Sequence, residues 1–212
     1  MVLTGAGGAG KTRLALELAA SSTESFAAGI WWVDLAPVTH DDQVGPTLAN
    51  VLGVRPLPGR THAQAVVMRL ADERALVVLD NCEHVSEGAA DLCEALLRGC
   101  PRVVVLATSR TPLRVPGESD WRVPSLSPSD ASALFVDRAG QARPGFALDD
   151  VSAAAVARIC GEVDGLPLAI ELAAARVRML SVSQLAERLS DRFGLLTGGP
   201  RGSSVQIGRA HV

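Results

Sequence analysis

The 212-residue sequence predicts an α/β fold in which a parallel sheet is flanked by helices and followed by a small helical subdomain. Two observations carry this prediction. The continuous apolar runs "RALVVLD" at 74–80 and "RVVVLATSR" at 102–110 are typical of strands buried on both faces. These runs alternate with segments of helical apolar spacing, which indicates parallel strands joined by helical crossovers. After about residue 126 only helical patterns remain.

The elements of the α/β part follow in a regular order. Five segments are predicted as strands from short apolar or β-rich runs: 1–5, 29–35, 74–80, 102–110 and, more weakly, 120–126. Helical apolar spacing between them predicts helices at 11–21, 41–53, 62–72 and 86–98. A strand followed by a helix, repeated along the chain, favours one open parallel sheet.

The segment from residue 127 onward predicts a helical module. It begins with "SPSDASALFVDRA", where Ser127 or Ser129 can cap the first helix. Gly165 is predicted to end one of the following helices. Pro167 can open the next, because the first helical turn does not need the N–H that proline lacks. We therefore expect an α/β domain at 1–126, a helical subdomain at 127–197 and a flexible, non-native tail at 198–212, where no helical or strand period is present.

Composition excludes several classes of protein. The net charge is −3 and the isoelectric point is about 5.8, so no basic excess indicates binding to nucleic acid or to a membrane surface. No apolar run reaches the roughly 18 residues of a membrane span, and no secretory signal opens the chain. The four cysteines show no CxxC spacing, which favours reduced structural thiols and a cytoplasmic location.

The segment "GAGGAGKT" at 5–12 contains the only lysine of the chain, although the chain has 20 Lys and Arg residues. It fits the pattern GxxxxGK[ST] and lies between a predicted strand and a predicted helix, as a phosphate-binding P-loop requires. Glycines let backbone N–H groups turn toward phosphate oxygens, and a compact ammonium fits the enclosed site better than a guanidinium. A glycine-rich turn that matches by chance is the alternative. The residues predicted to bind nucleotide here are Gly5, Gly7, Gly8, Ala9, Gly10, Lys11, Thr12 and Arg13.

Three further positions complete the predicted site. Thr12 and Asp80, which ends the run "LVVLD", are expected to coordinate Mg²⁺. Asn81 stands where many hydrolytic P-loop proteins have a second acid, which predicts slow turnover. Arg110, at the end of "VVLATSR", is a candidate sensor of the γ-phosphate, although it could simply be a solvated residue at a strand end. Catalytic roles are thus expected for Asp80, Asn81 and Arg110.

The roles of Glu83 and His84, which follow Asn81 closely, are left open by the sequence. Glu83 and His84 could assist a water molecule, or they could be solvated loop residues, which we slightly favour. The sequence says more about which base the bound nucleotide carries. Guanine-specific GTPases read the base with an NKxD-type motif that needs a lysine outside the P-loop, and this chain has none. ATP or ADP is therefore expected rather than GTP.

The segments "GAGGAGKT", "LVVLDNCEH", "LATSR" and "GLPLAIELAAARV", in this order, resemble the signal-transducing (STAND, apoptotic ATPase-like) ATPases of the NB-ARC group. The resemblance extends over about 1–197 and is greatest to the ATPase modules of bacterial transcriptional regulators of the LuxR and antibiotic-regulatory types. It implies a sheet of strand order 5-1-4-3-2, bound ATP or ADP with Mg²⁺, and a slow switch that controls an effector domain. It also implies that Arg110 is the sensor and that Pro167 packs near the base or ribose.

This resemblance further implies parts that lie outside the chain, namely an adenine-contacting segment, a winged-helix subdomain, and sensor and DNA-binding domains. The fragment itself is then not expected to bind nucleic acid or membrane, and the full-length protein could form a nucleotide-dependent oligomer. An ordinary P-loop ATPase or kinase and a non-hydrolysing assembly module are the alternative functions. The chain is expected to be at most a slow Mg²⁺-dependent ATPase.

Overall fold

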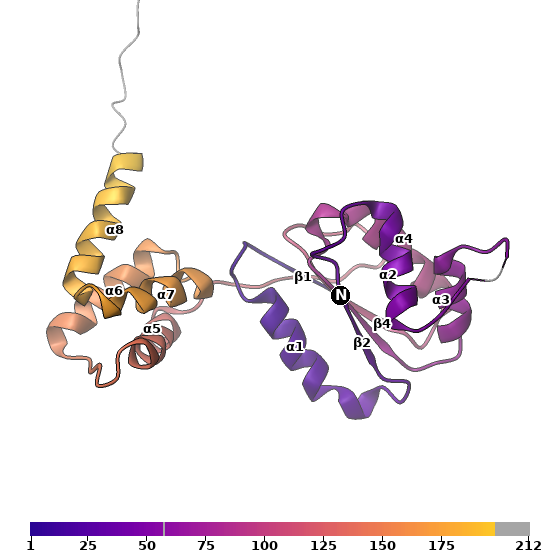
Figure 1. Cartoon of the computed structure of the whole chain (residues 1–212), viewed down its shortest axis with the longest axis horizontal. Helices are drawn as coiled ribbons and strands as arrows, with labels where there is room; N and C mark the ends of the chain where they lie inside the picture. The colour runs from indigo at the N-terminus through magenta and orange to yellow at the C-terminus, as the bar shows by residue number, and fades with distance from the viewer. Residues whose placement is uncertain (57, 198–212) are drawn as a thin grey trace, which may run out of the picture. The chain divides into compact units, whose positions relative to one another are not determined.

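The computed structural model describes residues 1–56 and 58–197 (Figure 1). The predicted tail at 198–212 lies outside the described residues. The chain divides into two compact units, Met1–Pro124 and the part from Ser125 onward. Each unit has its own hydrophobic core, and the two are described separately below.

The first unit is built on a five-stranded sheet whose strand order is β2-β3-β4-β1-β5. Every pairing between neighbouring strands is parallel. The prediction of a parallel sheet of order 5-1-4-3-2 is therefore confirmed, since the two orders are the same sheet read from opposite edges. The strands are β1 (Val2–Thr4), β2 (Ile30–Asp34), β3 (Leu76–Asp80), β4 (Val104–Thr108) and β5 (Asp120–Arg122).

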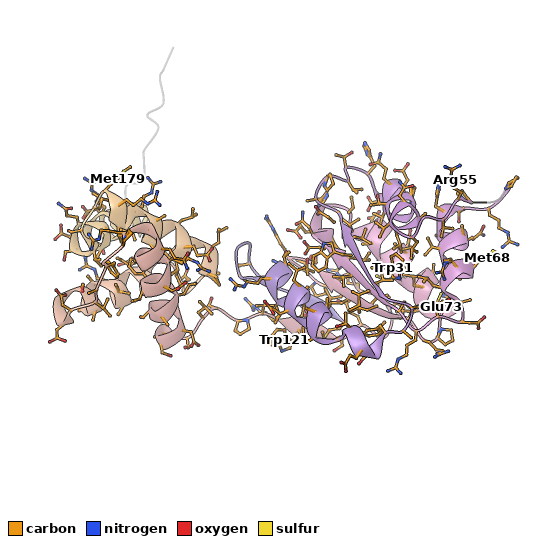
Figure 2. The ribbon with its side chains drawn as sticks, turned by 60° about the horizontal axis from the view of Figure 1, so that its bottom comes forward. Trp31, Arg55, Met68, Glu73, Trp121 and Met179 are labelled. Atoms are coloured by element: carbon orange, nitrogen blue, oxygen red, sulfur yellow. The ribbon has the colours of Figure 1, made fainter. Side chains whose placement is uncertain are left out.

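Helices cover both faces of this sheet (Figure 1). Successive residues of β3 point to opposite faces, so Leu76 and Val78 pack with α1 while Val77 and Leu79 pack with α2, α3 and α4. The edge strand β5 is different, because all three of its residues are exposed to solvent. Trp121, for example, is 47% exposed (Figure 2). The helices are α1 (Lys11–Ser21), α2 (Val44–Val51), α3 (His62–Leu70) and α4 (Ser86–Gly99).

The helix expected at 41–53 is shorter than predicted. Asp41–Gln43 forms a 3₁₀ turn, and α2 begins only at Val44. Pro46 explains this start, because proline is tolerated in the first turn of a helix but would break a hydrogen bond deeper inside it. The helix expected at 62–72 likewise ends earlier, at Leu70.

The 3₁₀ turn at Asp41–Gln43 packs closely against the start of α4. A carboxylate oxygen of Asp41 accepts a hydrogen bond from the backbone N–H of Gly88, with a donor–acceptor distance of 2.7 Å. It thereby caps a helix more than forty residues away in the sequence. The approach needs glycine at position 88, because a Cβ there would lie 2.2 Å from the backbone oxygen of Asp41.

The second unit is entirely helical in its described part. Its first helix is capped by Ser127 rather than Ser129, since the Ser127 hydroxyl accepts a hydrogen bond from the N–H of Asp130. Pro167 opens a helix as predicted, and Gly165 before it has a left-handed φ of +64°. Its core contains Phe135, Ile159 and other apolar side chains. The helices are α5 (Pro128–Ala142), α6 (Asp150–Glu162), α7 (Pro167–Ala174) and α8 (Val182–Thr197).

Two further findings concern membrane-spanning helices and the cysteines. Within residues 1–56 and 58–197, no helix is long and apolar enough to cross a membrane. All four cysteines are buried free thiols, namely Cys82, Cys93, Cys100 and Cys160.

Candidate functional site

The loop between β1 and α1 has the backbone of a phosphate cradle. Gly5, Gly8 and Gly10 adopt positive φ angles of 143°, 80° and 93°, which L side chains rarely reach. Gly5 is also crowded, since a Cβ there would lie 3.2 Å from the backbone oxygen of Val123. The loop runs into the N-terminus of α1, whose free N–H groups and helix dipole favour an anion. The other predicted loop residues, Gly7 and Ala9, belong to the same turn.

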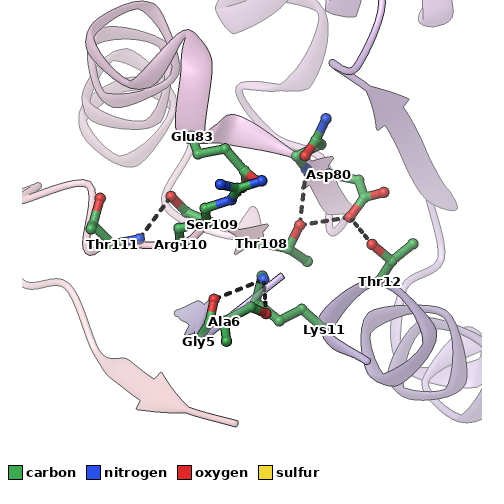
Figure 3. Close-up of polar contacts among 11 residues, drawn as sticks. Gly5, Ala6, Lys11, Thr12, Asp80, Glu83, Thr108, Ser109, Arg110 and Thr111 are labelled. Atoms are coloured by element: carbon green, nitrogen blue, oxygen red, sulfur yellow. Dashed lines mark hydrogen bonds and ion pairs between the residues drawn. The ribbon is translucent and has the colours of Figure 1, made fainter. Parts of the chain in front are cut away.

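Lys11 is the first residue of α1, and its side chain folds back over this loop (Figure 3). Its Nζ donates hydrogen bonds to the backbone oxygens of Gly5, at 2.9 Å, and Ala6, at 3.0 Å. The residue is only 9% exposed. Burial lowers the pKa of Lys11 below its ordinary value; Glu83 and Asp80 oppose this effect, and Arg110 adds to it. The ammonium is thus held beside the cradle without a carboxylate bonded to it.

Asp80 is the last residue of β3, so it lies at the carboxyl ends of the strands, as does the loop that follows β1. It is 7% exposed. One of its carboxylate oxygens accepts hydrogen bonds from the hydroxyls of Thr12, at 2.9 Å, and Thr108, at 2.6 Å. The Thr108 hydroxyl in turn accepts the backbone N–H of Asn81, at 2.9 Å. A hydroxyl and a carboxylate side by side are the kind of oxygen donors that Mg²⁺ uses when it also binds phosphate. The predicted pair Thr12 and Asp80 is therefore brought together.

Asn81 and Arg110 converge on Glu83. Asn81 has a left-handed φ of 68°, a conformation that asparagine tolerates better than most residues. When the Asn81 amide nitrogen faces Glu83, it lies 3.2 Å from both carboxylate oxygens. The Nε of Arg110 donates to the same carboxylate at 3.0 Å (Figure 3). Arg110 also extends over the P-loop, because its Nη2 would lie 3.8 Å from a Cβ on Gly7.

An open hollow of about 550 Å³ lies at this end of the site. Its lining residues come from the turn after β3 and the end of β4, and they are Asn81, Glu83, His84, Arg110 and Thr111. His84 has a further partner, since its Nε2 lies 2.7 Å from the backbone oxygen of Val38. Arg13 is exposed on α1. Pro167 belongs to the second unit, where it opens α7.

Sequence reasoning missed two contacts of this site. The first is the bridge by Thr108 between Asp80 and the backbone of Asn81, and the second is the ion pair between Glu83 and Arg110. The signal for the first was present, because a hydroxyl residue and an acid end adjacent parallel strands. The second has no sequence signal, since Glu83 lies in a short 3₁₀ turn whose direction the local sequence does not determine.

Comparison with known sequences finds bacterial proteins that are similar to this chain over part of their length. A Mycobacterium tuberculosis protein named "Putative HTH-type transcriptional regulator" is 47% identical over 204 residues, which are 96% of this chain and 23% of that protein. The regulatory protein AfsR of Streptomyces coelicolor is 32% identical over 205 residues, which cover 89% of this chain and 19% of AfsR. The chain therefore spans about a quarter or less of these two relatives. No protein-family model matches the chain.

Solved structures share the fold at low sequence identity. Cdc6p from Pyrobaculum aerophilum has a TM-score of 0.59 at 16% identity, covering 91% of this chain and 56% of that one. The ADP form of the ORC2 protein from Aeropyrum pernix has a TM-score of 0.57 at 16% identity, covering 90% and 61%. A STAND protein with a tetratricopeptide repeat sensor from Pyrococcus horikoshii has a TM-score of 0.54 at 16% identity, covering 90% and 30%. With the strand order of the sheet and the glycine-rich loop after β1, these likenesses show that the chain has the α/β fold of P-loop NTPases, and its sequence relatives include transcriptional regulators.

Proposed function

We propose that this chain is the ATP- or ADP-binding switch module of a multidomain transcriptional regulator of the STAND type. The observation that carries the proposal is the arrangement around Lys11. The buried ammonium, the positive-φ glycine loop and the linked pair of Thr12 and Asp80 all meet at the carboxyl edge of one parallel sheet. Ligands of open parallel sheets bind at this edge. An ADP form among the similar structures and regulators among the sequence relatives support the proposal.

Each residue has a defined task in this proposal. The loop N–H groups and Lys11 bind the β- and γ-phosphate oxygens. Thr12 and Asp80 would hold a Mg²⁺ ion, which would supply positive charge to the phosphates. Thr108 positions Asp80 by its hydrogen bond.

Slow hydrolysis, or none, fits the residues beside Asp80. The Asn81 amide cannot accept a proton from water at neutral pH. Glu83 can, but its carboxylate is paired with Arg110. A chain that holds ATP for long periods suits a switch, in which the bound nucleotide sets the state of domains beyond this chain. In the longer protein the units proposed at 1–126 and 127–197 act with effector and sensor domains in the cytoplasm, and the active form could be an oligomer.

The direct test is calorimetry of ADP and ATP binding to the wild type and to Lys11→Ala and Lys11→Arg. A charge-assisted hydrogen bond contributes about 1.5–3 kcal/mol, so we expect both variants to bind about 10- to 100-fold more weakly. Arg98→Ala, which removes an exposed charge on α4, is the matched control and should bind like wild type. Equal affinities in all four proteins would contradict the proposal.

A second measurement separates a switch from an ordinary enzyme. Turnover by the purified chain should lie far below the ~1–100 s⁻¹ typical of kinases. A rate of ~1 s⁻¹ or more that Asp80→Ala abolishes would instead favour the ordinary P-loop enzyme.

A further inference from the structure

Glu83 holds two polar groups that come from different strand ends. Its carboxylate pairs with Nε of Arg110, after β4, and it faces the amide of Asn81, after β3. The Glu83 side chain is 21% exposed, whereas that of Arg110 is 67% exposed. The carboxylate is therefore the more buried partner, and the arginine is the one that can swing away.

This pair lies at the phosphate end of the candidate site. The Arg110 guanidinium reaches over Gly7 of the P-loop, and both Glu83 and Arg110 line the hollow of about 550 Å³ beside it. The charges on both residues also act on Lys11, since Glu83 raises its pKa and Arg110 lowers it. A third phosphate bound by Lys11 would thus lie close to a carboxylate that repels it and to an arginine that is already paired.

We propose that Glu83 sets the preference of the chain between nucleoside diphosphate and triphosphate by holding Arg110 until a γ-phosphate competes for it. This inference rests on the proposed function. A diphosphate leaves the pair of Glu83 and Arg110 intact. A triphosphate must draw the guanidinium away and also tolerate the carboxylate, so Glu83 weakens triphosphate binding selectively. Glu83 is then a specificity-determining residue that biases the site toward the diphosphate state.

The expected effect is moderate because Arg110 is largely exposed. Pairs of this kind contribute at most about 1 kcal/mol, which corresponds to about a five-fold change in affinity. Repulsion between Glu83 and the additional phosphate charge acts in the same direction, and both contributions decrease as salt screens them. The ratio of the two affinities, rather than either affinity alone, is the quantity that reports the effect.

The test measures the dissociation constants of ADP and of a non-hydrolysable ATP analogue by calorimetry. Glu83→Gln keeps the shape of the side chain and removes its charge, so the triphosphate should bind about two- to five-fold more tightly relative to ADP. Arg110→Ala should have the opposite effect, so that the triphosphate binds more weakly relative to ADP. In the Arg110→Ala background, Glu83→Gln should have a clearly smaller effect on the ratio, since there is no arginine left to release and only the repulsion remains to be relieved. Glu87→Gln, an exposed acid in the first turn of α4, is the control and should leave the ratio unchanged.

Other outcomes separate the two proposals. An unchanged ratio in Glu83→Gln would overturn this inference while leaving nucleotide binding intact. An equal gain for both nucleotides, or a full effect of Glu83→Gln without Arg110, would show a general charge effect and overturn it as well. A wild-type chain that binds neither nucleotide would contradict the proposed function itself, and this inference with it.

Discussion

Thr108 shows how much of the site depends on one buried hydroxyl. It is 1% exposed, it donates to the Asp80 carboxylate, and it accepts the backbone N–H of Asn81. The residue thereby links the end of β4 to the residue that follows β3. It holds both the acid proposed to bind the metal and the turn that leads to Glu83.

Replacing Thr108 with valine should therefore affect both stability and metal use. The valine keeps the shape but leaves the Asn81 N–H without its acceptor, at a cost of about 1–3 kcal/mol in the free energy of unfolding. Asp80 loses a donor at the same time, so the Mg²⁺ dependence of nucleotide binding should weaken. Thr108→Ser keeps the hydroxyl and should stay close to wild type in urea unfolding and in Mg²⁺ titration. If valine and serine behaved alike, the hydroxyl would have no such role.

At the scale of single elements, the contact between Asp41 and α4 gives the sharpest prediction. Alanine normally stabilises a helix by up to about 1 kcal/mol relative to glycine. At position 88 the new Cβ would meet the Asp41 backbone at 2.2 Å, and overpacking of this kind costs about 1–3 kcal/mol or more. Because the new Cβ would meet backbone that cannot move aside easily, we expect the cost to exceed the gain and Gly88→Ala to lower the free energy of unfolding by about 1–2 kcal/mol.

Gly140→Ala provides the matched control for this prediction. It lies in α5, where an added Cβ meets nothing within 4 Å, so the substitution should be neutral or stabilising. Urea denaturation of the two variants and the wild type measures the difference. A Gly88→Ala variant as stable as Gly140→Ala would mean that α4 and the 3₁₀ turn can separate without cost.

Helices and strands could be predicted from the sequence where the signal lies within one segment. Features that depend on contacts between distant segments could not. Buried strands such as β3 read as unbroken apolar runs, and the P-loop has a spacing that few other structures share. The early part of the 41–53 segment was predicted as α-helix because periodicity does not distinguish a 3₁₀ turn. The site contacts of Thr108 and Glu83 depend on side chains meeting across β3 and β4, which no window along one segment can show.

At the scale of the whole molecule, each of the two units has a hydrophobic core of its own. The sheet unit has its core on the two faces of the sheet, and the helical unit has a separate core around Phe135 and Ile159. The cysteines are divided in the same way, with Cys160 in the helical unit and three in the sheet unit. Thiol labelling can therefore report on each unit separately.

We expect all four thiols to resist labelling in native buffer and Cys160 to become reactive at a different urea concentration from the other three. Burial raises the pKa of all four thiols above its ordinary value, that of Cys93 to about 12, so folding lowers the fraction of reactive thiolate at each of them. Mass spectrometry of labelled peptides at increasing urea concentration measures each site. Simultaneous labelling of all four would show that the two units unfold as one.

The pairing of β1 also determines when the phosphate site can form during synthesis. Val2 is aligned with Ala107 of β4 and with Asp120 of β5, so the strand that leads into the P-loop has no neighbour until roughly a hundred more residues have been made. At about 5–20 residues per second the ribosome needs roughly 5–20 s for that length. Long-range parallel pairing of this kind also closes slowly. The glycine loop is thus translated before the rest of the sheet unit but assembled late, and the proposed nucleotide site can form only after most of the sheet unit has left the ribosome.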